Sequence, residues 1–305
     1  MRRFGLVLVG SALAVVVSRA DSIQLKPAAD TAIFAAKPTS NFGKEGALPL
    51  GTINNSSDPG RVLLKFDLGT LPAGAVVTNV SLRLTVVKQR PGGAKETIGA
   101  HRMSRAWGEG SKAGTLGAVA SSGEATWQAA AVGQGTWNVP GGSAGTDFVS
   151  ASSSTAILGG PANYTFASTA DLVADVQAWA KDPAANFGWL LVSQQENVRG
   201  NAKRVASRED AARSPILTVQ FTVPTVPPPV ARFDRIVLRG DAAELGFRAL
   251  AGNIYTVSVR DRAGDGAWQP LTNIVSKFQD ADAVVTEPAT TAARFYQVAI
   301  TGQVD

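Results

Sequence analysis

The sequence predicts an all-β protein: an antiparallel β-sandwich with one short helix, followed by a second, smaller β-sandwich. The main observation is a regular alternation of apolar and polar residues, which is typical of strands with one buried face. Val80–Val86 has four apolar residues at every second position, and Arg61–Asp67 has three. Leu71–Gly74 lies between the two runs, and its proline and glycine favour a compact turn. We interpret the two runs as the strands around which the first domain is organised, each with one buried face and one exposed to water.

Shorter alternating runs predict the other strands of the first domain, because turn-forming residues separate them. These runs are Ser22–Lys26, Ala32–Ala36, Leu48–Gly51, Thr97–Met103, Gly188–Val192, Lys203–Ser207 and Ile216–Thr222. Residues 104–163 are rich in glycine, serine and alanine but contain three tryptophans. Since an indole ring seeks a core or a ligand, we expect ordered loops with a few short strands there.

One helix is expected over Ser168–Lys181. Ser168 is a suitable N-cap, and Asp171 three residues later completes a capping-box-like pair. The apolar residues Leu172, Val173, Val176 and Trp179 fall on one helix face, which places Asp175 on the solvated face. Asp182–Pro183 ends the helix, because proline cannot continue the hydrogen-bond ladder.

A proline-rich segment divides the chain into two domains, which we place at residues 21–222 and 232–305. Residues 223–231, VPTVPPPVA, favour polyproline II and are predicted to be a semi-rigid linker. Alternating runs after it predict a small sandwich of the fibronectin or immunoglobulin type. These runs are Phe233–Arg239, Leu245–Leu250, Ile254–Arg260, Val284–Thr286 and Arg294–Ile300.

The first 20 residues are interpreted as a secretory signal peptide that is cleaved after Ala20. Arg2 and Arg3 precede an apolar run, and small residues occupy the −3 and −1 positions of the cleavage site. A retained membrane anchor is the alternative. Without this segment the chain has 26 basic and 24 acidic residues, a balance that does not favour nucleic-acid binding. The chain has no cysteine, which excludes thiol nucleophiles and thiolate metal sites.

Several segments of the first domain stand out together. They are AADTAIFAAKPTSNFG, RVLLKFDLGTLPAGAVVTNVSLRLTV, RAWGEG, ATWQAA, GTWNVPGG, STADLVADVQAWAKDPAANFGWLLV and ASREDAARSPILTVQF. In this order they resemble the DNRLRE-type secreted bacterial β-sandwich domain, which is also classed with the family 96 carbohydrate-binding modules. The resemblance implies a jelly-roll-like sandwich, a secreted location and, in some members, binding of acidic polysaccharides such as alginate.

Two groups of residues are candidates for binding a carbohydrate. Trp127 and Trp137 lie in loops and could stack on sugar rings, or else anchor those loops by packing. Lys203, Arg204 and Arg208 belong to the densest basic segment and could recognise uronate carboxylates. The alternative for this segment is an edge strand that charge protects from aggregation.

The remaining candidates for chemistry are few. His101 is the only histidine and is expected to be a structural residue of a strand. Asp171 and Asp175 could in principle serve acid–base catalysis, although nothing in the sequence indicates a perturbed pKa at either. No cofactor is expected, apart from a structural calcium ion that Asp30, Asp147 and backbone carbonyls could hold.

The sequence therefore predicts a secreted, non-catalytic protein that binds an extracellular polysaccharide, and the resemblance implies that an acidic one such as alginate is a candidate. The alternative is a structural or adhesive cell-surface protein without affinity for glycans. A hydrolase or lyase is the least favoured of the three. A polysaccharide is the expected partner; neither nucleic acid nor, once the signal peptide is cleaved, a membrane is expected to be one.

Overall fold

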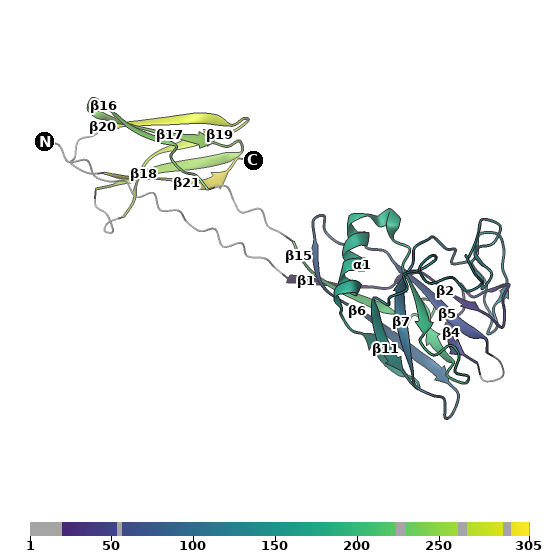
Figure 1. Cartoon of the computed structure of the whole chain (residues 1–305). Helices are drawn as coiled ribbons and strands as arrows, with labels where there is room; N and C mark the ends of the chain where they lie inside the picture. Colours follow the sequence, from purple (N-terminus) through teal and green to yellow (C-terminus); the bar gives the residue numbers. More distant parts are fainter. Residues whose placement is uncertain (1–19, 54–56, 224–229, 262–266, 289–293, 305) are drawn as a thin grey trace. The chain divides into compact units, whose positions relative to one another are not determined.

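The computed structural model describes residues 20–53, 57–223, 230–261, 267–288 and 294–304. The chain forms two compact units that meet in sequence at residues 224–225. The predicted signal peptide, apart from Ala20, lies outside the described residues. Among the residues that are described, no helix is long and apolar enough to cross a membrane. The predicted all-β class is confirmed, and each unit is a sandwich of antiparallel strands (Figure 1).

The first unit contains fifteen of the described strands. They are β1 (Ala20–Leu25), β2 (Pro27–Phe34), β3 (Ser40–Asn41), β4 (Ala47–Thr52), β5 (Pro59–Phe66), β6 (Val76–Gln89), β7 (Glu96–Arg102), β8 (Ala118–Val119), β9 (Ala129–Ala131), β10 (Gly135–Thr136), β11 (Ser154–Leu158), β12 (Ala162–Phe166), β13 (Trp189–Ser193), β14 (Lys203–Ala206) and β15 (Ile216–Thr222). The long strands form one curled sheet of order β1-β15-β6-β14-β4-β5-β13-β7-β11, with β12 on β6 and β2 on β5.

Strand β4 joins the two halves of this curled sheet, since it pairs with β14 on one side and with β5 on the other. We call the halves the β6 half and the β5 half. The strands β5 and β6 were predicted to form the organising pair, and both exist. They are not hydrogen-bonded to each other, however, because β5 pairs with β2, β4 and β13 whereas β6 pairs with β12, β14 and β15. The turn between them crosses from one half of the sandwich to the other.

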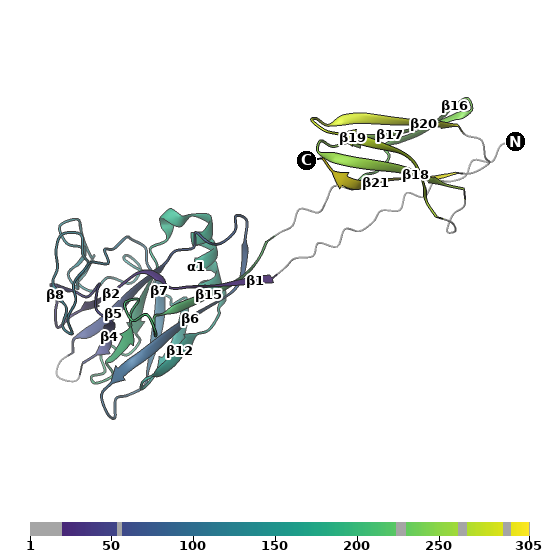
Figure 2. The same ribbon diagram turned by 180° about the vertical axis from the view of Figure 1, so that it is seen from behind.

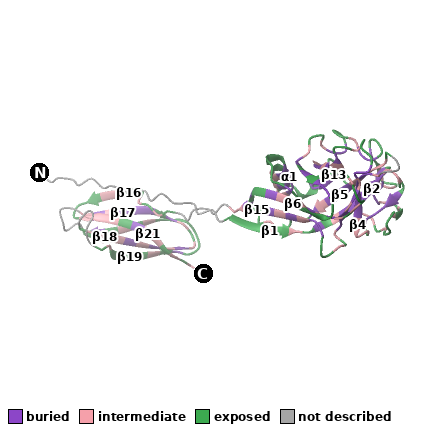
Figure 3. Ribbon diagram, turned by 90° about the horizontal axis from the view of Figure 1, so that it is seen from below, coloured by how far each residue is buried: buried purple, intermediate pink, exposed green. Residues whose placement is uncertain are grey.

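The main core lies between the two halves. Leu64 and Phe66 of β5 share it with Leu82 and Leu84 of β6, and all four side chains are buried. Figure 3 shows buried residues along β2, β4, β5 and β13. Packing of two inner sheet faces in this way is the usual architecture of a β-sandwich.

The outer face of the β5 half is covered as well, which corrects the prediction that one face of this strand pair is wet. Ile33, Leu63 and Leu190 point to that outer face and belong to a second buried cluster. The loops between residues 104 and 148 supply most of the rest of this cluster, and Figure 2 shows β8 among them, beyond β2 and β5. These loops are ordered and contain only short strands, as predicted. The outer face of β6 is polar, with Arg83 exposed.

Within the described residues the first unit has one α-helix, α1 (Ala170–Lys181), followed by a short 3-10 turn at Pro183–Ala185. The N-cap is Thr169, whose Oγ1 accepts a hydrogen bond from the backbone of Leu172, and not Ser168 as predicted. The Ser168 hydroxyl accepts from the backbone of Val80 instead, which ties the helix to β6. Asp175 was placed on the solvated face but is buried.

The second unit contains the remaining described strands, which form two three-stranded antiparallel sheets of order β16-β17-β20 and β19-β18-β21. Their bounds are β16 (Arg235–Arg239), β17 (Ala242–Ala249), β18 (Asn253–Arg260), β19 (Gln269–Ser276), β20 (Ala281–Pro288) and β21 (Phe295–Gln303). Leu245, Phe247, Tyr255 and Val257 form the core between the sheets. This arrangement is consistent with the predicted fibronectin- or immunoglobulin-like sandwich. Strand β19 was not predicted.

Candidate functional site

Trp137, one of the two predicted stacking platforms, is part of the second core. Its side chain is 4% exposed, and its Nε1–H donates to the carbonyl oxygen of Thr126 at 2.8 Å. The ring packs with Met103 and Phe148 of the same cluster. The structure therefore does not present this ring to a sugar, and the anchoring alternative describes it better.

Trp127, the other predicted platform, is half-buried between two fixed groups. The Arg61 guanidinium lies 5.3 Å from the centroid of the ring. Gly141 is so close that a Cβ atom there would come within 2.6 Å of the indole, and its positive φ of 88° also favours glycine. Arg61 further donates to the carbonyl oxygens of Gly141 and Gly142, at 2.8 and 3.1 Å. Trp127 thus packs against neighbouring loops, which favours the anchoring alternative for this ring.

Lys203 was predicted to face a glycan, but its side chain is completely buried. Its Nζ lies 3.0 Å from Oε1 of Glu96, whose side chain is equally inaccessible. The same ammonium donates to the carbonyl oxygens of Ala94 and Asn201, at 3.1 and 2.8 Å. All three N–H donors of the ammonium are used inside the protein. Lys203 therefore cannot contribute to a cationic surface in this structure.

The other two predicted basic residues are also engaged in internal contacts. Arg204 is half-buried and donates to the carbonyl oxygens of Ala47 and Thr115; burial lowers the pKa of its guanidinium. Arg208 is partly exposed and donates to the carbonyl oxygen of Ala28. It also lies 3.3 Å from a carboxylate oxygen of Glu109. The structure does not bring Lys203, Arg204 and Arg208 together into one surface.

The two carboxylates predicted for calcium lie in separate networks. Asp147 is fully buried and surrounded by donors: Oδ1 faces Nη1 of Arg105 at 3.0 Å, and Oδ2 accepts from the backbone of Asn138 and Ser143. Such an environment does not suit a cation. Asp30 accepts from the backbone of Arg208 through Oδ2, while its buried Oδ1 has no hydrogen-bond partner. Within the described ranges, no group of three or more histidine or acidic side chains could hold a metal ion.

Asp175 has a perturbed pKa that nothing in the sequence indicated. Burial raises its pKa, although the Ser153 hydroxyl and the Trp189 indole both donate to Oδ2, at 2.5 and 2.8 Å. Arg102 Nε approaches Oδ1 at 3.5 Å. His101 is structural, as predicted: its Nδ1 lies 3.0 Å from the carbonyl oxygen of Val149, and burial lowers its pKa.

An open hollow lies among the loops that cover the β5 half, and we call it the Trp107 hollow. It has a volume of about 340 Å³. Trp107 is half-buried, and its Nε1–H donates to the carbonyl oxygen of Phe187 at 2.8 Å, which fixes the ring. Arg105 and Gln134 also line the hollow, with small residues such as Gly123 between them. Gln134 is exposed at the rim.

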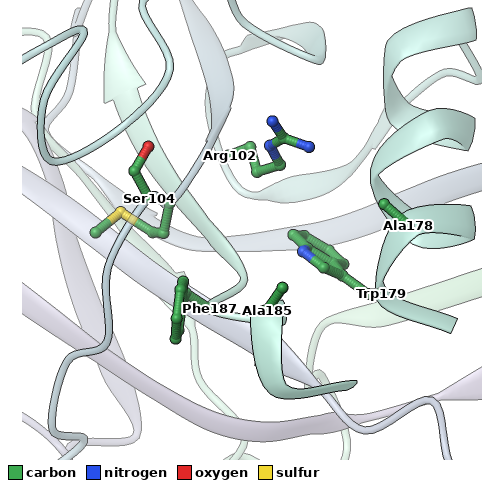
Figure 4. Close-up of a pocket in the computed structure, with 7 residues that line it drawn as sticks. Arg102, Ser104, Ala178, Trp179, Ala185 and Phe187 are labelled. Carbon is green, nitrogen blue, oxygen red and sulfur yellow. The ribbon is translucent and has the colours of Figure 1, made fainter. Parts of the chain in front are cut away.

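A second hollow, of about 280 Å³, lies where α1 meets the end of β7; we call it the Trp179 hollow. Figure 4 shows that its side chains come from β7 and the residues after it, from α1 and from the turn that follows α1. Trp179, Phe187 and Met103 give it an apolar lining, and Arg102 and Ser104 supply polar groups.

A comparison with known protein families found a match to the N-terminal part of the first unit. Residues 21–113 match the family described as Carbohydrate-binding module family 96. This part of the first unit is therefore similar to family 96, and the predicted resemblance is confirmed over residues 21–113. A search of curated proteins found no match.

The family 96 match begins at β1, runs through the sandwich strands up to β7, and ends in the loop that carries Arg105 and Trp107. The residues from Gly123 to Gly135 that complete the Trp107 hollow follow the matched segment. The sequence left Trp107 without a role, although it belongs to RAWGEG, one of the segments that carried the resemblance. That segment was the signal which could have identified the residue.

Proposed function

We propose that this chain is a secreted, non-catalytic protein that binds an extracellular polysaccharide in the Trp107 hollow. The observation that carries the proposal is a fixed, half-buried indole ring that lines an open hollow beside a guanidinium and an amide, in a unit that is similar to family 96 over residues 21–113. A concave site with an aromatic surface and a few oriented polar groups is the usual form of a small-ligand site.

The side chains of the hollow supply the interactions that a sugar ring requires. The apolar CH face of a sugar can pack on the indole of Trp107, whose single N–H is already used by Phe187. The Gln134 amide can both donate to and accept from hydroxyl groups. Arg105 can offer a forked pair of N–H donors to a uronate carboxylate, which favours an acidic polysaccharide.

The chemistry of the hollow also supports a binding role without catalysis. General acid–base catalysis needs a titratable side chain within reach of the substrate. Among the described residues that line the Trp107 hollow, none is Asp, Glu or His. Asp30 and Asp175, whose pKa values burial raises, are held in hydrogen-bond networks of their own. The secreted location rests on the signal-like sequence of Met1–Ala20.

Affinity electrophoresis of the full chain tests this proposal. Alginate and a neutral β-glucan would be cast into native gels at low and high salt. We expect retardation by alginate that weakens with salt, because exposed charges are screened. Trp107→Ala should weaken retention roughly thirtyfold, the effect of losing about 2 kcal/mol from an aromatic anchor.

Two further variants test whether binding depends on the Trp107 hollow and not on another part of the protein. Gln134→Ala should weaken binding without changing stability, since Gln134 is exposed. Trp268→Ala is the control, because Trp268 is a half-buried tryptophan of the second unit that packs 4.4 Å from the Arg260 guanidinium. It should bind like the wild type. Absence of retention on every polysaccharide would refute the proposal and favour a structural or adhesive role.

A further inference from the structure

The Trp107 hollow and the Trp179 hollow are adjacent. Residues 102–104 line the Trp179 hollow and residues 105–108 line the Trp107 hollow, so one continuous segment contributes to both. Phe187 lines the Trp179 hollow, and its carbonyl oxygen accepts the hydrogen bond that fixes Trp107. Arg102 and Arg105 lie three residues apart, so their Cα atoms are separated by at most about 10 Å.

The two arginines share the same kind of support. Arg102 is 43% exposed and pairs on its inner side with the buried Asp175, at 3.5 Å. Arg105 is 37% exposed and pairs in the same way with the fully buried Asp147, at 3.0 Å. In each case a buried carboxylate holds the guanidinium in place. Because a guanidinium has five N–H donors, further donors are available to a ligand.

The Trp179 hollow repeats the chemical pattern of the Trp107 hollow. Its accessible aromatic surface comes from the half-buried Phe187, because Trp179 is only 3% exposed, and beside it lie a supported arginine and the hydroxyl of the exposed Ser104 (Figure 4). An apolar floor with a cationic group beside it suits a sugar ring that carries a carboxylate. Asp175 lies behind Arg102, on the side away from such a ligand.

We propose that the Trp179 hollow is a second sugar subsite, and that the two hollows together bind consecutive parts of one acidic polysaccharide chain. This inference rests on the proposed function of the Trp107 hollow. It predicts that affinity depends on chain length: an oligouronate long enough to occupy both hollows binds more tightly than a short one. The shared segment 102–108 is the floor over which the chain passes.

A variant that fills the Trp179 hollow from its rim tests the inference. Ala178 lies on the exposed surface of α1 and lines the hollow, so Ala178→Trp would occupy the space without disturbing the core. The matched control is Ala174→Trp, because Ala174 is exposed one helical turn earlier and does not line the hollow. Titration calorimetry of the full chain would compare a diuronate with a hexauronate derived from alginate.

The expected result is a hexauronate affinity that Ala178→Trp lowers roughly tenfold, the effect of losing one stacked ring. Diuronate affinity should stay the same in this variant, and Ala174→Trp should bind both ligands like the wild type. If Ala178→Trp leaves hexauronate binding unchanged while Trp107→Ala weakens it roughly thirtyfold, the second subsite is refuted and the proposed function stands. If the wild-type chain binds neither oligouronate, the proposed acidic glycan itself is wrong.

Discussion

Lys203 Nζ and Glu96 Oε1 lie 3.0 Å apart inside the first unit, and neither side chain is exposed to solvent. The pair connects β14 in the β6 half to β7 in the β5 half. The Ser193 hydroxyl donates to the second carboxylate oxygen of Glu96 at 2.5 Å. Burial raises the pKa of Glu96, which the hydrogen bond from Ser193 and the charge of Lys203 partly oppose. A basic residue that the sequence assigned to ligand binding is thus an internal link between the two halves of the sandwich.

Removing one member of this pair should destabilise the first unit strongly. Lys203→Met leaves the Glu96 carboxylate buried without its counter-charge, so we expect the free energy of unfolding to fall by about 3–5 kcal/mol. Urea denaturation followed by tryptophan fluorescence measures this change. Lys88→Met is the control, since Lys88 lies on the neighbouring strand β6 and is exposed; its effect should stay within about 0.5 kcal/mol. Equal effects of the two substitutions would contradict the account.

Arg61 should determine how firmly the tryptophan loops are held. Its Nε and Nη2 contact the two carboxylate oxygens of Glu196 at 2.7 Å each, while Nη1 reaches the loop carbonyl oxygens of Gly141 and Gly142. Arg61→Lys keeps the charge but loses this fork and the stacking on Trp127. We expect limited proteolysis to cleave the variant faster within residues 104–148. Arg83→Lys, at an exposed position of β6, should digest like the wild type. Unchanged cleavage of both would show that Arg61 does not order these loops.

Asp30 should make the first unit less stable as the pH rises. Burial raises its pKa from 3.8 to about 7, and the nearby carboxylates of Glu109 and Glu209 add to this, against the Arg208 backbone hydrogen bond and the Arg208 charge. Because the folded state holds the proton more tightly than the unfolded state, its stabilising effect is complete below the unfolded pKa of 3.8 and is lost as the pH rises through about 7.

The substitution Asp30→Asn isolates this effect, since it removes the titrating group and leaves Asp175 in place. We expect urea unfolding to show that the variant gains stability relative to the wild type between pH 5 and pH 8. The backbone N–H of Arg208 donates to Asp30 in the wild type and can donate to the side-chain oxygen of the asparagine, so the substitution keeps this hydrogen bond. A difference between the two proteins that is constant across this pH range would contradict the raised pKa.

Trp137 should matter mainly for stability and Trp107 mainly for binding. Trp137→Ala removes a buried ring and its hydrogen bond to Thr126, so we expect a loss of about 3–5 kcal/mol in the free energy of unfolding. Trp107→Ala should cost less stability and weaken polysaccharide retention roughly thirtyfold, because that ring is half-buried beside an open hollow. Calorimetric melting and affinity electrophoresis on the same samples make the comparison. A Trp137 variant that keeps its stability and loses binding would restore Trp137 as the platform.

The strands themselves could be predicted because alternation is a local property of the sequence. Val80–Val86 lies within β6, and the predicted Ile216–Thr222 is β15 as the structure has it. Strand β19 was missed because Gln269–Ser276 contains a proline and several polar residues and does not alternate clearly. The helix start differed by one residue in the N-cap, since both Ser168 and Thr169 are good caps and only the contact of Ser168 with Val80 decides between them.

The pairing of strands and the site depend on contacts between residues that are far apart in the sequence. Nothing within Arg61–Val86 shows that β5 and β6 lie in different halves of the sandwich, because their actual partners are β2, β4, β12, β13, β14 and β15. Likewise, Lys203 meets Glu96 across 107 positions. Residue type alone favoured Trp127 and Trp137 over Trp107. Only the fold shows that Trp137 is buried, that Trp127 packs against Arg61 and Gly141, and that Trp107 lines a hollow.

The central claim is that the Trp107 hollow binds an acidic polysaccharide. The most direct measurement is titration calorimetry of the full chain and of Trp107→Ala with a hexauronate, at low and at high salt. We expect saturable binding by the wild type that weakens with salt and is roughly thirtyfold weaker in the variant, while both proteins remain folded. Equal binding by the two proteins, or no binding by the wild type, would contradict the claim.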